Sequence, residues 1–276
     1  MVKLTKYAKF SRSLPSFLYK FLAQQYIDLE YPRHLFIETT ANCNLACEFC
    51  PREKIKNDID FTLFKEIVDE STHYGPKSFS LHLFGEPLLY PRILEAIRYI
   101  KEQNKRHTVL LTTNGTLLNK FAQELEALGV DKIIWSYRKH NFNEASRRLL
   151  KKHGLIRFLI EETPEGEIEQ WKGYEKEVKH LHNYGGNIKV EHEPQVGRYP
   201  CYHLFLAPAV RWNGEIVECC NIPQPGTEVL GKYGEVNIRD VWKGSKLSIL
   251  RDSHLAKIYP GACKGCNSWQ AYPSIW

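Results

Sequence analysis

Eight cysteines are the residues of this chain best suited to chemistry, and they fall into two groups. Cys43, Cys47 and Cys50 lie within one stretch of eight residues. The other five lie in the final third of the chain: Cys201, Cys219, Cys220, Cys263 and Cys266. Scattered buried thiols would not leave 150 cysteine-free residues between two groups. Because cytosolic thiol pools keep cysteines reduced, this clustering favours metal binding over disulfides.

The first group favours an iron–sulfur cluster with one open iron. Three thiolates from a short loop can bind three irons of a cubane cluster, which leaves the fourth iron to a substrate or cofactor. Zinc is the alternative, but closed structural zinc sites use four protein ligands, usually in closely spaced pairs. The spacing of three residues and then two between Cys43, Cys47 and Cys50 fits that pattern poorly.

The second group has the spacing of a four-thiolate site. Cys201 is followed by twelve residues, Gly214, four residues and Cys219, and two residues separate Cys263 from Cys266. On spacing alone, these thiols could be the ligands of either a zinc ion or an iron–sulfur cluster.

Composition excludes some classes of protein. The 276 residues are enough to bury a sizeable core, and 38 basic against 32 acidic residues leave a net charge of +6. That bias is compatible with anionic ligands but is too small to indicate nucleic-acid binding. No apolar run approaches the ~20 residues that a bilayer crossing needs. The N-terminus lacks a signal-peptide pattern, and we expect a cytoplasmic protein.

Between the cysteine groups, apolar strand patterns alternate with helical periodicity. Strands are predicted at 34–40, 78–84, 108–114, 132–137, 156–162 and 187–193. Helices are predicted at 61–72, 92–103, 119–129, 142–154 and 167–183, with Gly129 and Gly154 placed as C-caps. Such alternation predicts an α/β fold with a parallel sheet, closed or half-closed into a six-unit (β/α) barrel. Chemistry in such folds gathers at the carboxyl ends of the strands, and the first cysteine group directly follows the first strand.

Three segments are expected: an N-terminal helical segment (1–33), the barrel (34–194) and a small C-terminal domain (195–276). The boundary is set by the prolines and glycine of 194–201. The C-terminal domain is predicted to hold a hairpin at 205–220 that turns at Asn213-Gly214, and one helix at 236–252. The first segment is basic and amphipathic, with an apolar helical face: Leu14, Phe17, Leu18, Phe21, Leu22 and Tyr26. A helix that plugs the lower end of the barrel and one that touches a membrane surface both fit this pattern.

The run from Cys43 to Cys50, CNLACEFC, resembles the C-x3-C-x-aromatic-C signature of the radical S-adenosylmethionine (SAM) enzymes. The resemblance implies a 4Fe-4S cluster held by Cys43, Cys47 and Cys50, with the amino and carboxylate groups of SAM on the unique iron. One-electron reduction then cleaves SAM to methionine and a 5'-deoxyadenosyl radical, which abstracts a substrate hydrogen. An external one-electron donor such as flavodoxin or ferredoxin is implied as a partner.

Further stretches match the pattern of this family at three successive strand ends. Gly85, Glu86 and Pro87 follow the second strand as in the family's GGEP-type motif, with Phe84 in place of its first glycine. Thr113 and Asn114 end the third strand, and Ser136 ends the fourth. The resemblance implies SAM contacts at these residues, and Phe49 is expected near the adenine. Ordinary turns, a solvated serine and a packing phenylalanine are the alternatives.

The C-terminal cysteines resemble the auxiliary-cluster domain of radical SAM enzymes, called SPASM, in its shortened "twitch" form. That resemblance implies a second 4Fe-4S cluster, held by Cys201, Cys219, Cys263 and Cys266. Cys220 is surplus to this set. Because side chains alternate along a strand, Cys219 and Cys220 are expected to point to opposite faces, and the glycine spacing assigns the ligand to Cys219.

Three functions are compatible with these sites. The first is dehydrogenation of a hydroxyl-bearing small molecule such as a sugar or cyclitol, with the auxiliary cluster accepting an electron. The twitch-bearing aminocyclitol dehydrogenases of the family resemble the chain in length and motifs. The second is maturation of a ribosomal peptide, and the third is a non-catalytic iron–sulfur redox module. No catalytic base is assigned, although several residues near strand ends are candidates for substrate contact: Tyr137, Arg138, His140, Arg157 and His192.

Overall fold

The computed structural model describes residues 16–137, 156–161, 176–179, 183–189, 200–223 and 227–267. The chain divides into two compact units. We call Leu35–Leu181 with Val210–Gly214 the barrel unit, and Met1–His34, His182–Ala209 and Glu215–Trp276 the appendage unit. The predicted helix at 142–154, most of that at 167–183, Leu14 and Gly154 lie outside the described residues.

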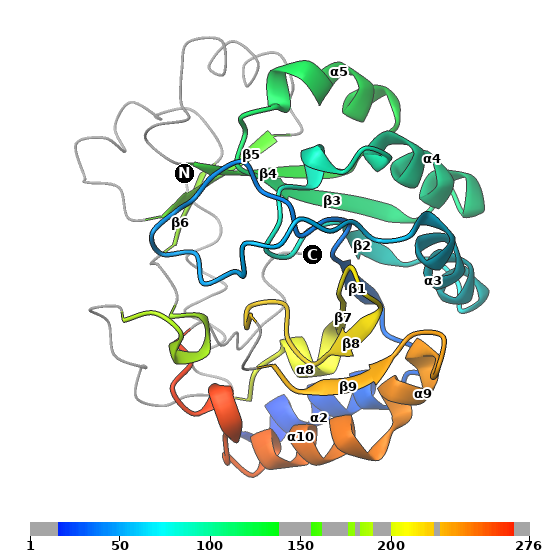
Figure 1. The fold of residues 1–276 in the computed structure, drawn as a ribbon. Coiled ribbons are helices and arrows are strands. Elements are labelled where there is room, and N and C mark those ends of the chain that lie inside the picture. The colour runs from blue at the N-terminus through cyan, green and yellow to red at the C-terminus, as the bar shows by residue number, and fades with distance from the viewer. Residues whose placement is uncertain are drawn as a thin grey trace. The chain divides into compact units, whose positions relative to one another are not determined.

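The barrel unit contains a parallel sheet, as predicted (Figure 1). Its strands are β1 (His34–Ile37), β2 (Ser78–Ser80), β3 (Thr108–Thr113), β4 (Lys132–Tyr137), β5 (Ile156–Glu161) and β6 (Lys176–Lys179). They lie in the order β6-β5-β4-β3-β2-β1, and each pair from β2 to β6 is parallel. The strands lie side by side in the same order as in the chain, and parallel neighbours of this kind must be joined by crossover connections. This arrangement confirms the predicted α/β class.

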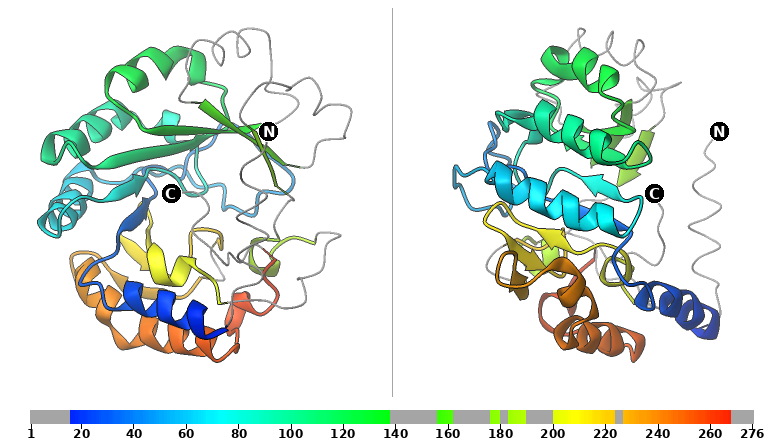
Figure 2. Two further views of the ribbon diagram at one scale, coloured as in Figure 1. Left: turned by 180° about the vertical axis from the view of Figure 1, so that it is seen from behind. Right: turned by 90° about the vertical axis from the view of Figure 1, so that its right-hand side faces the viewer.

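Three helices cover one face of this sheet and stack side by side in the right-hand view of Figure 2. They are α3 (Phe61–His73), α4 (Ile93–Gln103) and α5 (Leu118–Ala127). The carboxylate of Asp60 caps α3 by accepting hydrogen bonds from the backbone N–H groups of Thr62 (2.8 Å) and Leu63 (3.0 Å). Gly129, with φ of +73°, ends the α5 segment as predicted.

The two faces of the sheet differ in burial. Alternate residues on the helix-covered face are fully buried, among them Phe79, Val109, Leu111 and Trp135. Between them, Leu110 is also buried, but four other residues on β3 and β4 are only half-buried: Thr108, Thr112, Ile134 and Ser136. Since neighbouring side chains along a strand point to opposite faces, these four lie on the other side of the sheet, which we call the interior face.

The strand predicted at 187–193 does not begin there, and its residues 190–193 lie outside the described residues. The strand β6 is Lys176–Lys179, inside the segment predicted as a helix. Residues 184–186 of the chain form a 3-10 helix, η4 (Tyr184–Gly186), and 187–189 are not strand. β6 is an edge strand in which charged residues flank Val178, so it has little of the apolar pattern that marks a strand in sequence. Pairing with β5 decided its conformation.

The appendage unit combines helices from both ends of the chain with a short antiparallel pair. Its elements are α2 (Ser16–Ile27), η4, α8 (His203–Leu206), β8 (Glu215–Val217), β9 (Val229–Lys232), α9 (Ile238–Lys243), α10 (Ser245–Leu255) and η5 (Gly261–Cys263). β8 pairs with β9 antiparallel. The predicted turn is present between β7 (Ala209–Val210) and β8, where Gly214 has φ of +86° and donates to the carbonyl of Arg211 (2.9 Å).

The single helix predicted at 236–252 is two helices. Gly244 breaks it with an extended backbone (φ −73°, ψ 158°) that ends α9 and begins α10. A Cβ atom at this position would lie 2.8 Å from the carbonyl oxygen of Asp240. Only glycine has the freedom to pass so close to the preceding turn. Among the described residues, no helix is both long and apolar enough to cross a bilayer.

Candidate active site and auxiliary cysteine site

The loop after β1 carries the first three cysteines as free, half-buried thiols. The backbone N–H of Cys50 donates to the carbonyl of Cys47 (3.1 Å), which turns the loop back on itself. The guanidinium of Arg52 donates to the carbonyls of Leu45 (3.1 Å) and Cys43 (3.4 Å) and ties the two arms of the loop together.

The donor set of this loop fits an iron–sulfur cluster. Partial burial raises the pKa of Cys50, and the charges of Cys47 and Cys43 raise it further, so the three thiols lie close enough to influence one another. In the described part of the chain, no three His, Cys, Asp or Glu side chains already converge as metal ligands. Three soft thiolates in one short loop nevertheless match the ligand chemistry of iron–sulfur clusters better than that of hard cations.

Glu86 holds the loop after β2 against the end of β3. It is only 2% exposed. Its carboxylate accepts hydrogen bonds from the hydroxyl of Thr113 (2.7 Å) and the backbone N–H groups of Asn114 (2.7 Å) and Leu88 (3.1 Å). Burial raises the pKa of Glu86, and these hydrogen bonds oppose the rise. The backbone N–H of Glu86 donates to the carbonyl of Asn42 (2.7 Å), so this loop also contacts the cysteine loop.

Gly85 allows that contact. A Cβ atom there would overlap the carbonyl oxygen of Thr40 and lie 2.9 Å from that of Asn42. Pro87, the next residue but one, begins the 3-10 helix η1 (Pro87–Leu89) and is buried.

We expect Gly85→Ala to lower the free energy of unfolding of the apoprotein by about 1–3 kcal/mol, because backbone oxygens cannot move aside as a flexible side chain would. Thermal or denaturant unfolding measures the effect. Gly265→Ala is the matched control, since nothing lies within 4 Å of the added Cβ. Equal stability of the two variants would contradict the close approach.

Asn114 connects the end of β3 to the cysteine loop. Its side-chain amide donates to the Oδ1 of Asn44 (2.9 Å) and lies 3.8 Å from the Sγ of Cys43. The amide of Asn44 donates to the hydroxyl of Thr116 (2.8 Å), and that hydroxyl donates to the Oδ1 of Asn114 (2.7 Å). This ring of polar contacts fixes both the amide of Asn114 and the strand end beside the Cys43 thiol.

The fourth strand supports the same edge of the sheet. The indole N–H of Trp135 donates to the carbonyl of Asn114 (3.2 Å), and its ring occupies the space where a Cβ of Gly115 would lie. Gly115 has φ of +82°, a conformation that favours glycine. The β3–β4 register pairs Thr113 with Trp135, so Ser136 lies at the level of Asn114 on the interior face. Phe49 is half-buried within the cysteine loop.

Two polar residues near this edge were not predicted from the sequence. Glu38, at the end of β1, is buried and accepts hydrogen bonds from the backbone N–H groups of Phe84 and Trp212, both at 3.4 Å. Burial raises its pKa. The second is His82, in the segment after β2. A charged or polar residue within an otherwise apolar strand pattern was the available signal in each case.

His82 is held as a neutral ring by Thr112. Its Nδ1 accepts the backbone N–H of Thr112 (3.1 Å), so the ring proton lies on Nε2, which donates to the hydroxyl of Thr112 (3.0 Å). Phe36 packs edge-on against the same ring. Burial lowers the pKa of His82 to about 4.

Acid should therefore destabilise the protein through His82. In the unfolded chain His82 binds a proton near pH 6.5, but in the folded chain it does so only near pH 4. The contribution of His82 to the free energy of unfolding is therefore fully present above about pH 6.5 and is lost as the pH falls towards 4. We expect a loss of about 2 kcal/mol between about pH 7 and pH 4.5 that is absent in His82→Gln. Denaturant unfolding of both proteins across this range measures the difference. Parallel pH profiles would contradict the assignment.

The C-terminal cysteines gather within the appendage unit. The backbone N–H of Cys201 donates to the Nδ1 of His254 (3.1 Å), and the charge of Cys201 acts on Cys219. The backbone N–H of Cys266 donates to the carbonyl of Cys263 (3.3 Å) at the end of η5.

Gly185 brings the two halves of this cysteine set to one place. A Cβ there would lie 3.1 Å from side-chain atoms of both Ile222 and Ala262. Ile222 follows Cys219 by three residues, and Ala262 directly precedes Cys263. Hydrogen bonds between Asn183 and Asn267 (2.7 and 3.1 Å) close the same region. Four thiolates are the ligand set of a fully ligated cluster, and these contacts bring the segments that carry them together, although no three of the described thiols already converge as metal ligands.

The strand alternation from which Cys219 and Cys220 were predicted to point to opposite faces does not reach them. β8 ends at Val217, after a register shift between Ile216 and Val217, so the alternation of a strand does not extend to the two cysteines. The thiols hydrogen-bond to each other, which raises the pKa of Cys219 and lowers that of Cys220. The ring of His203, with its Nδ1 3.8 Å from the Sγ of Cys220, lowers the pKa of Cys220 further.

The substrate candidates near strand ends are not described by the structure. Arg138, His140 and His192 lie outside the described residues, and Tyr137 and Arg157 are described only as backbone in β4 and β5.

Comparison with known families agrees with this arrangement. Residues 37–161 match the radical SAM superfamily, and residues 201–267 match the SPASM iron–sulfur cluster-binding domain. The chain belongs to the radical SAM superfamily and is a radical SAM enzyme with a SPASM-type C-terminal region. These matches imply SAM and iron–sulfur clusters as cofactors, and they remove the hypothesis of a non-catalytic redox module.

Individual relatives share different amounts of the chain. It is 25% identical over 254 residues to an S-adenosyl-L-methionine-dependent 2-deoxy-scyllo-inosamine dehydrogenase of Niallia circulans, covering 84% of this chain and 91% of that protein. It is 34% identical over 109 residues to a tungsten-containing aldehyde ferredoxin oxidoreductase cofactor-modifying protein of Pyrococcus furiosus. That match covers 38% of this chain and only 30% of the relative.

The fold is similar to that of a solved structure. The crystal structure of BtrN with AdoMet and 2-DOIA matches with a TM-score of 0.65 and 22% identity, covering 87% of this chain and 97% of that one. This likeness confirms the partial-barrel fold with an appended hairpin and helix region.

Proposed function

We propose that this protein is a SAM-dependent dehydrogenase that oxidises a hydroxyl-bearing carbon of a cyclitol-class small molecule. The observation that carries the proposal is the nearly full-length match to the inosamine dehydrogenase, which includes the C-terminal region and not only the barrel. Matches confined to the barrel, such as that to the Pyrococcus furiosus protein, support only the SAM chemistry common to the superfamily.

In this proposal, Cys43, Cys47 and Cys50 hold the SAM-binding 4Fe-4S cluster. Gly85, Glu86 and Pro87 bring the backbone of their loop against the cysteine loop, where the amino group of SAM would bind. The contacts of the Glu86 carboxylate support a positioning role, because it accepts hydrogen bonds from the Thr113 hydroxyl and the Asn114 backbone N–H and so holds the end of β3 in place.

The remaining SAM contacts are assigned by position. The β3–β4 register puts Ser136 level with Asn114, and the amide of Asn114 lies beside the Cys43 thiol. Phe49, within that loop, would pack near the adenine. Thr113 faces Glu86 and would act through it, since its hydroxyl is engaged by that carboxylate.

The auxiliary 4Fe-4S cluster is assigned to Cys201, Cys219, Cys263 and Cys266. The interaction of Cys201 with Cys219 supports Cys219 as the ligand, and Cys220 is engaged by His203. Four protein ligands leave no iron free for a substrate, which favours electron transfer as the role of this cluster.

When bound, the SAM-binding cluster would supply the electron that cleaves SAM, and the auxiliary cluster would accept the electron left on the substrate. The substrate loses a hydrogen atom from carbon, a proton from its hydroxyl and one electron, and it becomes a ketone. The first electron comes from an external donor such as flavodoxin or ferredoxin. The protein positions the reacting carbon and excludes water from the interior face.

An anaerobic assay tests the proposal. Protein reconstituted with iron and sulfide, then mixed with SAM, dithionite and 2-deoxy-scyllo-inosamine, should release 5'-deoxyadenosine and a ketone in equal amounts. Cleavage of SAM without oxidation of any of a panel of aminocyclitols and sugars would overturn the substrate class. Iron and sulfide should each reach about eight per chain, as two cubane clusters require. One zinc with a single cluster would overturn the auxiliary-cluster assignment.

A further inference from the structure

Residues 1–36 lie outside both family models, yet α2 belongs to the same compact unit as the auxiliary cysteines. Of the predicted apolar face of α2, Phe21 is 60% exposed and Tyr26 is half-buried. The contacts of its C-terminal end indicate what this helix does.

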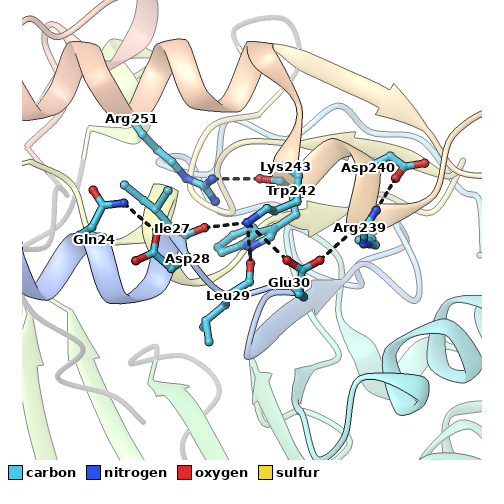
Figure 3. Close-up of polar contacts among 10 residues, drawn as sticks. All are labelled: Gln24, Ile27, Asp28, Leu29, Glu30, Arg239, Asp240, Trp242, Lys243 and Arg251. Carbon is cyan, nitrogen blue, oxygen red and sulfur yellow. Dashed lines mark hydrogen bonds and ion pairs between the residues drawn. The ribbon is translucent and has the colours of Figure 1, made fainter.

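Side chains of α9 bind backbone carbonyls at the end of α2 (Ile27) and just beyond it (Leu29), as Figure 3 shows. The indole N–H of Trp242 donates to the carbonyl of Leu29 (3.0 Å). The ammonium group of Lys243 donates to the carbonyls of Ile27 (3.3 Å) and Leu29 (3.5 Å). The last carbonyls of a helix have no partner within it, and a cation there also opposes the negative end of the helix dipole. These contacts therefore join the two ends of the sequence at a helix terminus.

An exposed ion pair lies at the rim of the same contact. Glu30 pairs with Arg239 (2.8 Å) and lies 3.9 Å from Lys243 (Figure 3). The Glu30 side chain is 60% exposed, so water and salt screen the pair and its contribution to stability is small. The buried indole hydrogen bond is the stronger tie.

Trp242 is also connected, through Arg251, to the segment that carries Cys201. The indole is 1% exposed, and the guanidinium of Arg251 lies 4.0 Å over its ring. Arg251, itself 2% exposed, donates to the carbonyls of Trp242 and Leu204, each at 2.9 Å. Leu204 is in α8, three residues after Cys201. A buried guanidinium with these fixed bonds is a rigid link between α9 and α8.

A second route leads from α2 to Cys201 more directly. The ring of Tyr26, in the last turn of α2, packs edge-to-face on that of Tyr202 with centroids 5.3 Å apart. Tyr202 directly follows Cys201, whose own N–H is held by His254 of α10. The guanidinium of Arg33 lies over the ring of Tyr26, 5.6 Å from its centroid.

We propose that α2 with residues 26–30 is a positioning element of the auxiliary site, which holds the Cys201 segment where a cluster ligand must lie. The proposal depends on the assignment of an auxiliary cluster under the proposed function. A segment outside the family models thus completes a site inside them, since both routes from α2 end within three residues of Cys201. Neither a barrel plug nor a membrane anchor would require these contacts.

The test measures cluster content in the full-length protein. Tyr26→Ala, after anaerobic reconstitution, should retain about half the iron and sulfide of the wild type and lose the signal of the auxiliary cluster in electron paramagnetic resonance. Release of 5'-deoxyadenosine should stay within about threefold of the wild type, because the SAM site lies in the barrel unit. Tyr26→Phe keeps the ring contact and should restore full iron content.

Trp242→Phe separates positioning from global folding. It removes the indole N–H that binds Leu29 but keeps an aromatic ring beneath Arg251. The auxiliary-cluster content should fall to roughly one half to nine tenths of the wild-type value. Glu30→Gln changes only the exposed rim and should leave the iron content unchanged. Wild-type iron content in both Tyr26→Ala and Trp242→Phe would overturn the proposal.

The other outcomes are also decisive. If Tyr26→Ala loses both clusters together, the helix supports the whole fold rather than the auxiliary site, and the proposal fails. If the wild type itself binds only one cluster, the auxiliary-cluster assignment fails first, and the variants then bear on stability alone. Binding of the wild type to anionic vesicles that disappears in Phe21→Ser, with iron content unaffected by Tyr26→Ala, would favour the membrane role instead.

Discussion

Replacement of Cys47 by alanine should reduce the release of 5'-deoxyadenosine from SAM to the background of the assay, a loss of at least about a thousandfold. Cys47 is the middle of three thiols in a loop whose arms are tied by Arg52. With only two thiolates left, the cluster would lose the ligand set that leaves one iron open for SAM. The measurement is chromatography of anaerobic reactions with SAM and dithionite.

Cys220→Ala is the matched control for this loss. It removes one thiol from the same chain but lies outside both proposed ligand sets, so SAM cleavage should remain close to that of the wild type. Iron content separates the two cases as well, because Cys47→Ala should lose the iron of one cluster. Undiminished SAM cleavage by Cys47→Ala would show that these thiols are not the active-site ligands.

Replacement of Cys263 by alanine should spare SAM cleavage and stop product formation. Cys263 ends η5 in the appendage unit, and the turn is closed by the hydrogen bond from Cys266 to Cys263. Without the auxiliary cluster, the electron left on the substrate after hydrogen abstraction has no protein-bound acceptor. We expect 5'-deoxyadenosine within about tenfold of the wild type and ketone at background, with iron reduced by about half.

A loss of product by Cys263→Ala has a second possible cause, since metal binding and folding of the appendage are coupled. Thermal unfolding of the apoproteins distinguishes the two, because the apo form of Cys263→Ala should melt with the apo wild type if the cluster alone is affected. Normal ketone formation by Cys263→Ala would rule out the electron-acceptor role.

The sequence by itself determined the parts of the protein that depend on local pattern. Apolar residues every three or four positions were enough to predict α3, α4 and α5, whose buried residues lie on one face each. The spacing of Cys43, Cys47 and Cys50 indicated the class of chemistry, because ligands from one short loop need no information from the rest of the chain.

Tertiary structure decided the features that depend on residues far apart in the chain. Lys176–Lys179 became a strand through pairing with β5 although its own pattern is helical, and Glu86 found its partners 27 and 28 residues away. The hydrogen bond from Trp242 to the carbonyl of Leu29, just beyond α2, joins residues 213 positions apart. Local periodicity indicates which face of a helix or strand is apolar. The partner that covers this face, and the group that hydrogen-bonds to a given carbonyl, are decided only when the whole chain packs.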